Sequence, residues 1–136
     1  MKREVLWDSG AILALLDARD ANHVRALAVV ERLATARRPA FITNYLEAET
    51  HALLLARLGR GPAREWLFRG SLTVVRALLR DEQRAREILV RFEDKDFSLC
   101  DAVAFAVMER RGVRTAFSFD RHFRQYGRFD VLGPSD

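Results

Sequence analysis

The sequence predicts an α/β fold in which a five-stranded parallel sheet lies between helical layers, a three-layer α/β/α sandwich. Three observations support this fold class. Short runs rich in β-branched and aromatic residues alternate with helical segments, these runs are apolar on both faces, and no linker or internal repeat divides the 136 residues. We therefore expect a single domain over residues 1–136.

The first half of the chain is predicted to form two strands and three helices. A short apolar run predicts a strand at 5–7, and the helix that follows, 9–16, begins with a serine near its cap. Apolar residues at helical spacing predict a second helix at 21–36, which a proline ends. The second strand, 40–43, leads into a helix at 45–58 that two glycines close.

The second half is predicted to form three more strands and three more helices. The expected helices are 62–69, 81–92 and 98–111, and the expected strands are 72–75, 115–118 and 129–132. Pro62 suits the first turn of its helix, because the missing N–H costs no hydrogen bond there. In a parallel sheet built from such units, a ligand site lies beyond the carboxyl ends of the strands, where the strand order reverses.

The composition is basic and includes one cysteine. With 23 Lys and Arg against 19 Asp and Glu, the formal net charge is +4 and the pI about 10.0, which suits a nucleic-acid partner without establishing one. Cys100 alone cannot form an internal disulfide, which fits a reducing cytoplasm. Asp8 interrupts the first apolar run and Asp17 ends it, so we expect a cytoplasmic protein with no membrane segment.

Acidic residues collect at the predicted carboxyl ends of the strands. Asp8 directly follows the first strand, Asp120 follows the fourth, and Asp101 lies in the first turn of the helix that leads into the fourth. Glu47 and Glu49 lie in the first turns of the helix that leaves the second strand. Each aspartate has an ordinary explanation, because a carboxylate near a helix start caps backbone N–H groups. Their coincidence at one end of the sheet is what indicates a site.

Such a cluster of carboxylates predicts a cation. Carboxylates that lie close together raise one another's pKa values unless a cation neutralises them. Oxygen ligands favour Mg²⁺ or Mn²⁺ over zinc. Because these ions activate water and neutralise charge on a phosphate, the sequence favours phosphodiester hydrolysis over acyl transfer. His23, His51 and His122 lack ligand spacing, and Cys100 is expected to be a small buried apolar residue, so none of them joins the predicted site.

Four short motifs surround these acids, in order along nearly the whole chain. They are DSGA at 8–11, TNYLEAET at 43–50, DKDFSLCDA at 94–102 and FSFDRHF at 117–123. Together they resemble the motifs of the PIN-domain nucleases, specifically the VapC-like toxins of bacterial and archaeal toxin-antitoxin modules. The resemblance implies strand order 3-2-1-4-5, a divalent-metal site holding Mg²⁺ or Mn²⁺, and endoribonuclease activity that leaves 5′-phosphate and 3′-hydroxyl ends.

The resemblance also assigns site residues. Carried over position by position, the catalytic and metal-binding quartet of the family falls on Asp8, Glu49, Asp101 and Asp120. Ser118 and Ser9 match small hydroxyl positions that support it. Glu47 remains the alternative to Glu49, because the leucines of this helix spread too widely around it for periodicity to choose between the two.

The partners that the resemblance implies are an RNA substrate and a cognate antitoxin protein, and it also implies a homodimer. The exposed surface of the helices between Ala21 and Leu58 is the expected face for either protein contact. These expectations rest on analogy with the family.

Three other functions are compatible with an acidic pocket on such a sheet. A PIN-like RNA-binding module without cleavage stays open, because only an assay separates it from an enzyme. A phospho-acceptor receiver domain is disfavoured, because the third strand ends in Val75-Arg76-Ala77 without the acceptor aspartate. A haloacid-dehalogenase-type phosphatase needs Asp-x-Asp after the first strand, where this chain has Gly10 in the third position.

Overall fold

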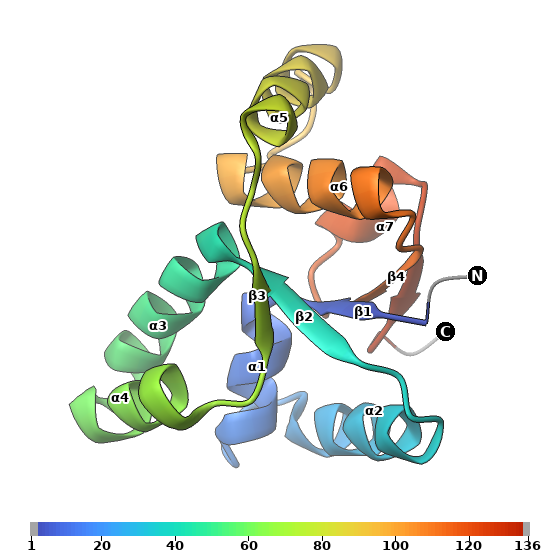
Figure 1. Ribbon diagram of the computed structural model, residues 1–136. Helices are drawn as coiled ribbons and strands as arrows, with labels where there is room; N and C mark the ends of the chain where they lie inside the picture. Colours follow the sequence, from blue (N-terminus) through green and yellow to red (C-terminus); the bar gives the residue numbers. More distant parts are fainter. Residues whose placement is uncertain (1–2, 135–136) are drawn as a thin grey trace.

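The computed structural model describes residues 3–134, which contain one five-stranded parallel sheet (Figure 1). The strands are β1 Val5–Trp7, β2 Ala40–Thr43, β3 Thr73–Val75, β4 Thr115–Phe117 and β5 Asp130–Leu132. Their order is β3-β2-β1-β4-β5, and every neighbouring pair is parallel. The predicted fold class and strand order are confirmed. The strand order reverses between β1 and β4, so a ligand site is expected where these two strands end.

The helices cover both faces of this sheet. They are α1 Ser9–Leu16, α2 His23–Thr35, α3 Asn44–Leu58, α4 Arg60–Arg69, α5 Leu79–Arg91, α6 Leu99–Arg111 and α7 His122–Tyr126. Figure 1 shows α5, α6 and α7 on one side of the sheet, α1 and α2 on the other, and α3 with α4 beside the β3 edge. Within residues 3–134, no helix has both the length and the apolar character needed to cross a membrane.

The short strands contribute side chains to cores on both faces. In β1, Leu6 joins the core under α5 and α6, while its neighbour Val5 joins the core under α1 and α2. In β4, Ala116 and Phe117 divide in the same way. Adjacent strand residues point to opposite faces, so a strand covered on both sides has to be apolar throughout. This is the physical origin of the unbroken apolar runs in the sequence.

Two features of the helices differ from the prediction. The α4 helix begins at Arg60 rather than at Pro62, because Gly59, with φ +90°, both ends α3 and precedes α4. Pro62 still lies in the first turn, where no hydrogen bond is lost. The α7 helix, His122–Tyr126, was not predicted, because five residues are too few to show a helical period. The other helix and strand ends lie within about two residues of the expected positions.

Candidate active site at the carboxyl end of the sheet

Asp8 lies where β1 ends and α1 begins. It is the N-cap of α1, and its Oδ1 accepts a hydrogen bond from the backbone N–H of Ser9 at 2.9 Å. Its Oδ2 accepts one from Ser118 Oγ, which follows β4, at 2.8 Å. The side chain of Asp8 is buried, and this burial raises its pKa from 3.8 to about 7, against the lowering effect of the Ser118 hydrogen bond. Asp101 and Glu49 add to the rise.

Asp101 is held at the start of α6 by a capping box. Ser98 Oγ accepts a hydrogen bond from the N–H of Asp101, and Asp101 Oδ2 accepts one from the N–H of Ser98, both at 3.0 Å. The residue is only 8% exposed. Burial raises its pKa, and so does Asp120, although hydrogen bonds from Ser98 and the charge of His122 oppose the rise. Capping and membership of the acidic cluster are therefore compatible roles for the same carboxylate.

Glu49 reaches the cluster from α3. Its Oε1 accepts a hydrogen bond from Ser9 Oγ at 2.5 Å, although the residue as a whole is exposed. Cys100 lies beside it, and the pKa of this thiol is raised by burial and by Glu49, so the thiol stays a protonated donor. Cys100 is half-buried rather than fully buried. Glu47 instead lines a small pocket beside β3, together with Trp66. Of the two glutamates, Glu49 is the one that lies with the other acids.

Asp120 and His122 complete the cluster. Asp120 Oδ1 accepts a hydrogen bond from the backbone N–H of His122 at 2.8 Å, which starts α7. The ring Nδ1 of His122 lies 2.8 Å from Asp101 Oδ2 and 3.2 Å from Asp120 Oδ1, at ion-pair distances but without the angle of a directed hydrogen bond. The ring packs edge-on against Phe97, with 5.6 Å between centroids. His122 therefore bridges two of the predicted acids.

Sequence reasoning missed His122 because its spacing from the other histidines does not suit a metal site. The signal that could have found it is its position two residues after Asp120. An aspartate side chain commonly accepts a hydrogen bond from the backbone N–H two residues further on, which holds that residue close to the carboxylate.

The four predicted acids come together from four segments, with Ser9 and Ser118 hydrogen-bonded among them. Within residues 3–134 no arginine or lysine forms an ion pair with any of the four, and His122 is the one basic group at ion-pair distance. The electrostatic consequence falls on the two buried acids: burial raises the pKa values of Asp8 and Asp101, and the neighbouring carboxylates add to the rise.

The donor chemistry of this cluster suits a hard divalent cation, because it consists of carboxylate and hydroxyl oxygens. The buried and destabilised charge of Asp8 is one that a cation would relieve. The arrangement is not that of a finished site, since no group of three or more His, Cys, Asp or Glu side chains in residues 3–134 is placed to hold an ion. Asp8 and Asp101 are buried and held by hydrogen bonds, whereas Glu49 and Asp120 are exposed.

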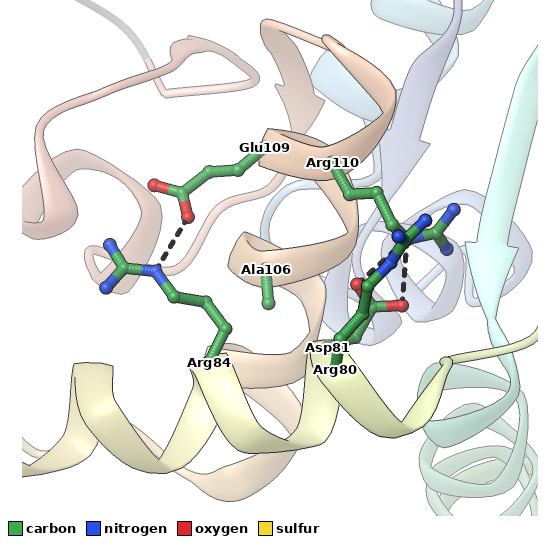
Figure 2. A pocket seen from close by; sticks show the side chains of 6 residues that line it. All are labelled: Arg80, Asp81, Arg84, Ala106, Glu109 and Arg110. Atoms are coloured by element: carbon green, nitrogen blue, oxygen red, sulfur yellow. Dashed lines mark hydrogen bonds and ion pairs between the residues drawn. The ribbon is translucent and has the colours of Figure 1, made fainter.

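A pocket of about 530 Å³ lies between α5 and the other end of α6 (Figure 2). The residues that line it are Arg80, Asp81, Arg84, Ala106, Glu109 and Arg110. Figure 2 shows Arg84 turned to Glu109 and Arg110 turned to Asp81, at 3.1 Å and 2.8 Å. Each ion pair has one member on α5 and one on α6, so these contacts join the two helices.

The family model described as the PIN domain matches residues 5–129. The chain belongs to the PIN-domain family. Among its relatives, a Mycobacterium tuberculosis protein named 23S rRNA-specific endonuclease VapC20 is 35% identical over 131 residues, which cover 93% of this chain and 97% of the relative. The resemblance to VapC-like PIN toxins that the four motifs indicated is thereby confirmed.

Solved PIN-domain structures share the same architecture. The crystal structure of Mycobacterium tuberculosis VapC20, described as a sarcin-ricin loop cleaving toxin, has a TM-score of 0.79 and 30% identity, covering 94% of this chain and 98% of that one. The toxin-antitoxin complex from Klebsiella pneumoniae has a chain with a TM-score of 0.70 and 15% identity, covering 97% of this chain and 98% of that one. The second likeness shows a shared fold only.

Proposed function

We propose that this PIN protein is a Mg²⁺- or Mn²⁺-dependent endoribonuclease, the toxin of a toxin-antitoxin pair, that hydrolyses RNA phosphodiester bonds. The observation that carries the proposal is the cluster of four carboxylates at the strand-order reversal, with Asp8 buried among acids and no arginine or lysine paired to any of them within residues 3–134. A protein that tolerates such a cluster gains from a cation supplied from outside. The relative named as a 23S rRNA-specific endonuclease supports RNA as the substrate class.

In this proposal, Asp8 and Asp101 are the buried, fixed ligands, and Glu49 and Asp120 are the exposed ones. Fixed ligands keep the site preorganised, and exposed ones can follow the ion and the substrate. When bound, the ion would activate a water molecule and neutralise charge on the phosphate. The pI of about 10.0 favours approach of an RNA backbone to the rest of the surface.

Three neighbouring side chains would act as positioning residues. Ser118 orients Asp8 through its 2.8 Å hydrogen bond, and Ser9 orients Glu49. His122 would position both Asp101 and Asp120, which lie 2.8 Å and 3.2 Å from its Nδ1. Outer contacts of this kind fix the rotamers of metal ligands and affect metal affinity about 10- to 100-fold.

An antitoxin partner and a homodimer belong to the same proposal. The solved neighbours include toxin-antitoxin assemblies, among them one from Klebsiella pneumoniae, which supports a protein antitoxin for this chain. Homodimerisation stays a prediction. Solution scattering that gives a monomer at every protein concentration would contradict it.

Cleavage of RNA in Mn²⁺ tests the proposal. We expect the wild-type protein to cleave single-stranded RNA, chelator to abolish cleavage, and Asp101→Asn to remain folded but inactive. Thermal melts provide a readout independent of turnover, since an ion that binds only the folded state raises its Tm, and this rise should be lost in Asp101→Asn. A wild-type protein that binds RNA but never cleaves it would favour the non-cleaving PIN-like module instead.

A further inference from the structure

Tyr45 stands next to the acidic cluster without belonging to it. It lies one helical turn before Glu49 on α3, and side chains four residues apart share one face of a helix. Cys100, which lies beside Glu49, is also close enough to Tyr45 to influence the pKa of its hydroxyl. The ring of Tyr45 is therefore placed along the same edge of the site as Glu49.

The ring of Tyr45 is anchored through its hydroxyl and is partly exposed. The Tyr45 hydroxyl donates a hydrogen bond to Glu82 of α5, which ties the ring to a second helix. The pKa of Tyr45 is raised mainly by this bond. The ring is half-buried, packed against the main core, yet no aromatic ring or cation within residues 3–134 stacks on it. A flat, immobilised and partly exposed ring is the kind of surface on which a nucleobase stacks.

A cation lies near Tyr45. Arg86 lies one turn beyond Glu82 on α5, is exposed, and is close enough to Tyr45 to oppose the effect of Glu82 on its pKa. No ion pair of Arg86 is formed within the described part of the chain, residues 3–134. A guanidinium beside an open aromatic ring suits a phosphate next to a stacked base.

We propose that Tyr45 is a substrate-positioning residue, on whose ring one unpaired nucleobase of single-stranded RNA stacks beside the acidic cluster. The inference rests on the proposed ribonuclease function and deepens it. It implies that the substrate is read in an unpaired segment, because only an unpaired base can leave its neighbours to stack on protein. It also implies that the hydroxyl of Tyr45 fixes the ring, whereas the ring itself makes the contact.

Fluorescence of 2-aminopurine tests the contact without turnover. The base analogue is placed in turn along a short single-stranded oligoribonucleotide and titrated with protein that carries Asp8→Asn, so that no cleavage occurs. We expect quenching at one position, kept when Tyr45→Phe is added and lost with Tyr45→Leu. Trp66→Leu is the matched control, since Trp66 is also half-buried but lies in α4, in a pocket with Glu47 and not with the four acids of the cluster. Tyr45→Met is a second ring-free variant if the leucine variant does not fold.

Steady-state cleavage provides the second readout. In the protein that retains Asp8, Tyr45→Leu should raise KM by about fivefold to a hundredfold, the range for loss of one stacked base, with a smaller change in kcat. Equal KM values and equal quenching for Tyr45 and its leucine variant would overturn the inference while leaving the ribonuclease proposal intact. Absence of cleavage by the wild-type protein would contradict the ribonuclease proposal. The 2-aminopurine quenching experiments would still decide whether a base stacks on Tyr45.

Discussion

The two ends of helix α6 carry acids in opposite electrostatic situations. At its start, Asp101 lies among other carboxylates, and its pKa is raised by burial and by Asp120. Near its end, burial alone would raise the pKa of Glu109, but hydrogen bonds from Tyr126 and Arg84 lower it. At the start of the helix, no arginine of the described residues neutralises the acids. At the other end, arginines neutralise them.

The acids at the two ends therefore have different roles. Those paired with arginines hold two helices together, and those without arginines are available to a ligand. Ion pairs with arginine join the end of α6 to α5. In one of them Arg110 pairs with Asp81, and Asp81 is only 2% exposed. At the start of the helix, the acids contact hydroxyls, backbone N–H groups and His122. Buried acids without an arginine partner reduce stability, and strongly perturbed pKa values of this kind cluster at functional sites. Mutating each end should therefore affect different properties.

The largest effect is expected from Asp8→Asn at the carboxylate end. Cleavage should fall by roughly a thousandfold or more, since even outer contacts of a metal site are worth 10- to 100-fold. The free energy of unfolding of the metal-free protein should not fall, because the amide removes a buried charge whose pKa is raised to about 7. Urea denaturation and RNA cleavage on the same preparation measure both. A variant that is less stable yet fully active would contradict the comparison.

Arg110→Ala should have the reverse pattern. It leaves Asp81 buried without its partner, which costs about 3 kcal/mol of unfolding free energy when one member of a buried pair is removed. Cleavage per folded molecule should stay close to wild type. Arg80→Ala, in the same pocket but exposed, is the matched control and should change stability little. Loss of cleavage in folded Arg110→Ala would show that the two ends are not independent.

The pH dependence of stability should have opposite signs at the two ends. Asp8 ionises near 3.8 in the unfolded chain and near 7 in the folded one, so its contribution to the unfolding free energy falls as pH rises between these values. From pH 5 to pH 7, the loss is about 2 kcal/mol in metal-free protein. Glu109, whose pKa is lowered, contributes stability above its unfolded pKa and loses it as pH falls.

Urea midpoints measured across this pH range in chelator test the sign. Asp8→Asn should flatten the decline between pH 5 and pH 7, and Glu109→Gln should leave that decline in place. A decline unchanged by Asp8→Asn would show that Asp8 does not titrate in this range.

The smallest effect is expected from a matched pair on α3. Glu49→Gln should reduce cleavage about tenfold or more, since an exposed ligand can be partly replaced by water. Glu47→Gln, two residues away on the same helix but in the lining of another pocket, should change cleavage little. Parallel cleavage assays in Mn²⁺ distinguish them. A larger loss from Glu47→Gln would transfer the role to that residue.

Periodicity and local chemistry alone predicted much of this protein. Apolar runs indicated the parallel sheet, and the expected helix at 98–111 corresponds to α6, because strand and helix patterns both depend on neighbours in the chain. The acids Asp8, Asp101 and Asp120 could be listed because each follows a strand or opens a helix.

Tertiary structure decided what depends on residues far apart in the sequence. The rotation of α3 brings Glu49, and not Glu47, to Ser9, although both lie early in one helix. The short α7 helix brings His122 to Asp101, 21 positions earlier in the chain (122 − 101). The direction in which a side chain points is set by packing between elements, which no local pattern specifies. The types of groups in the site are therefore properties of the sequence, and their partners are properties of the fold.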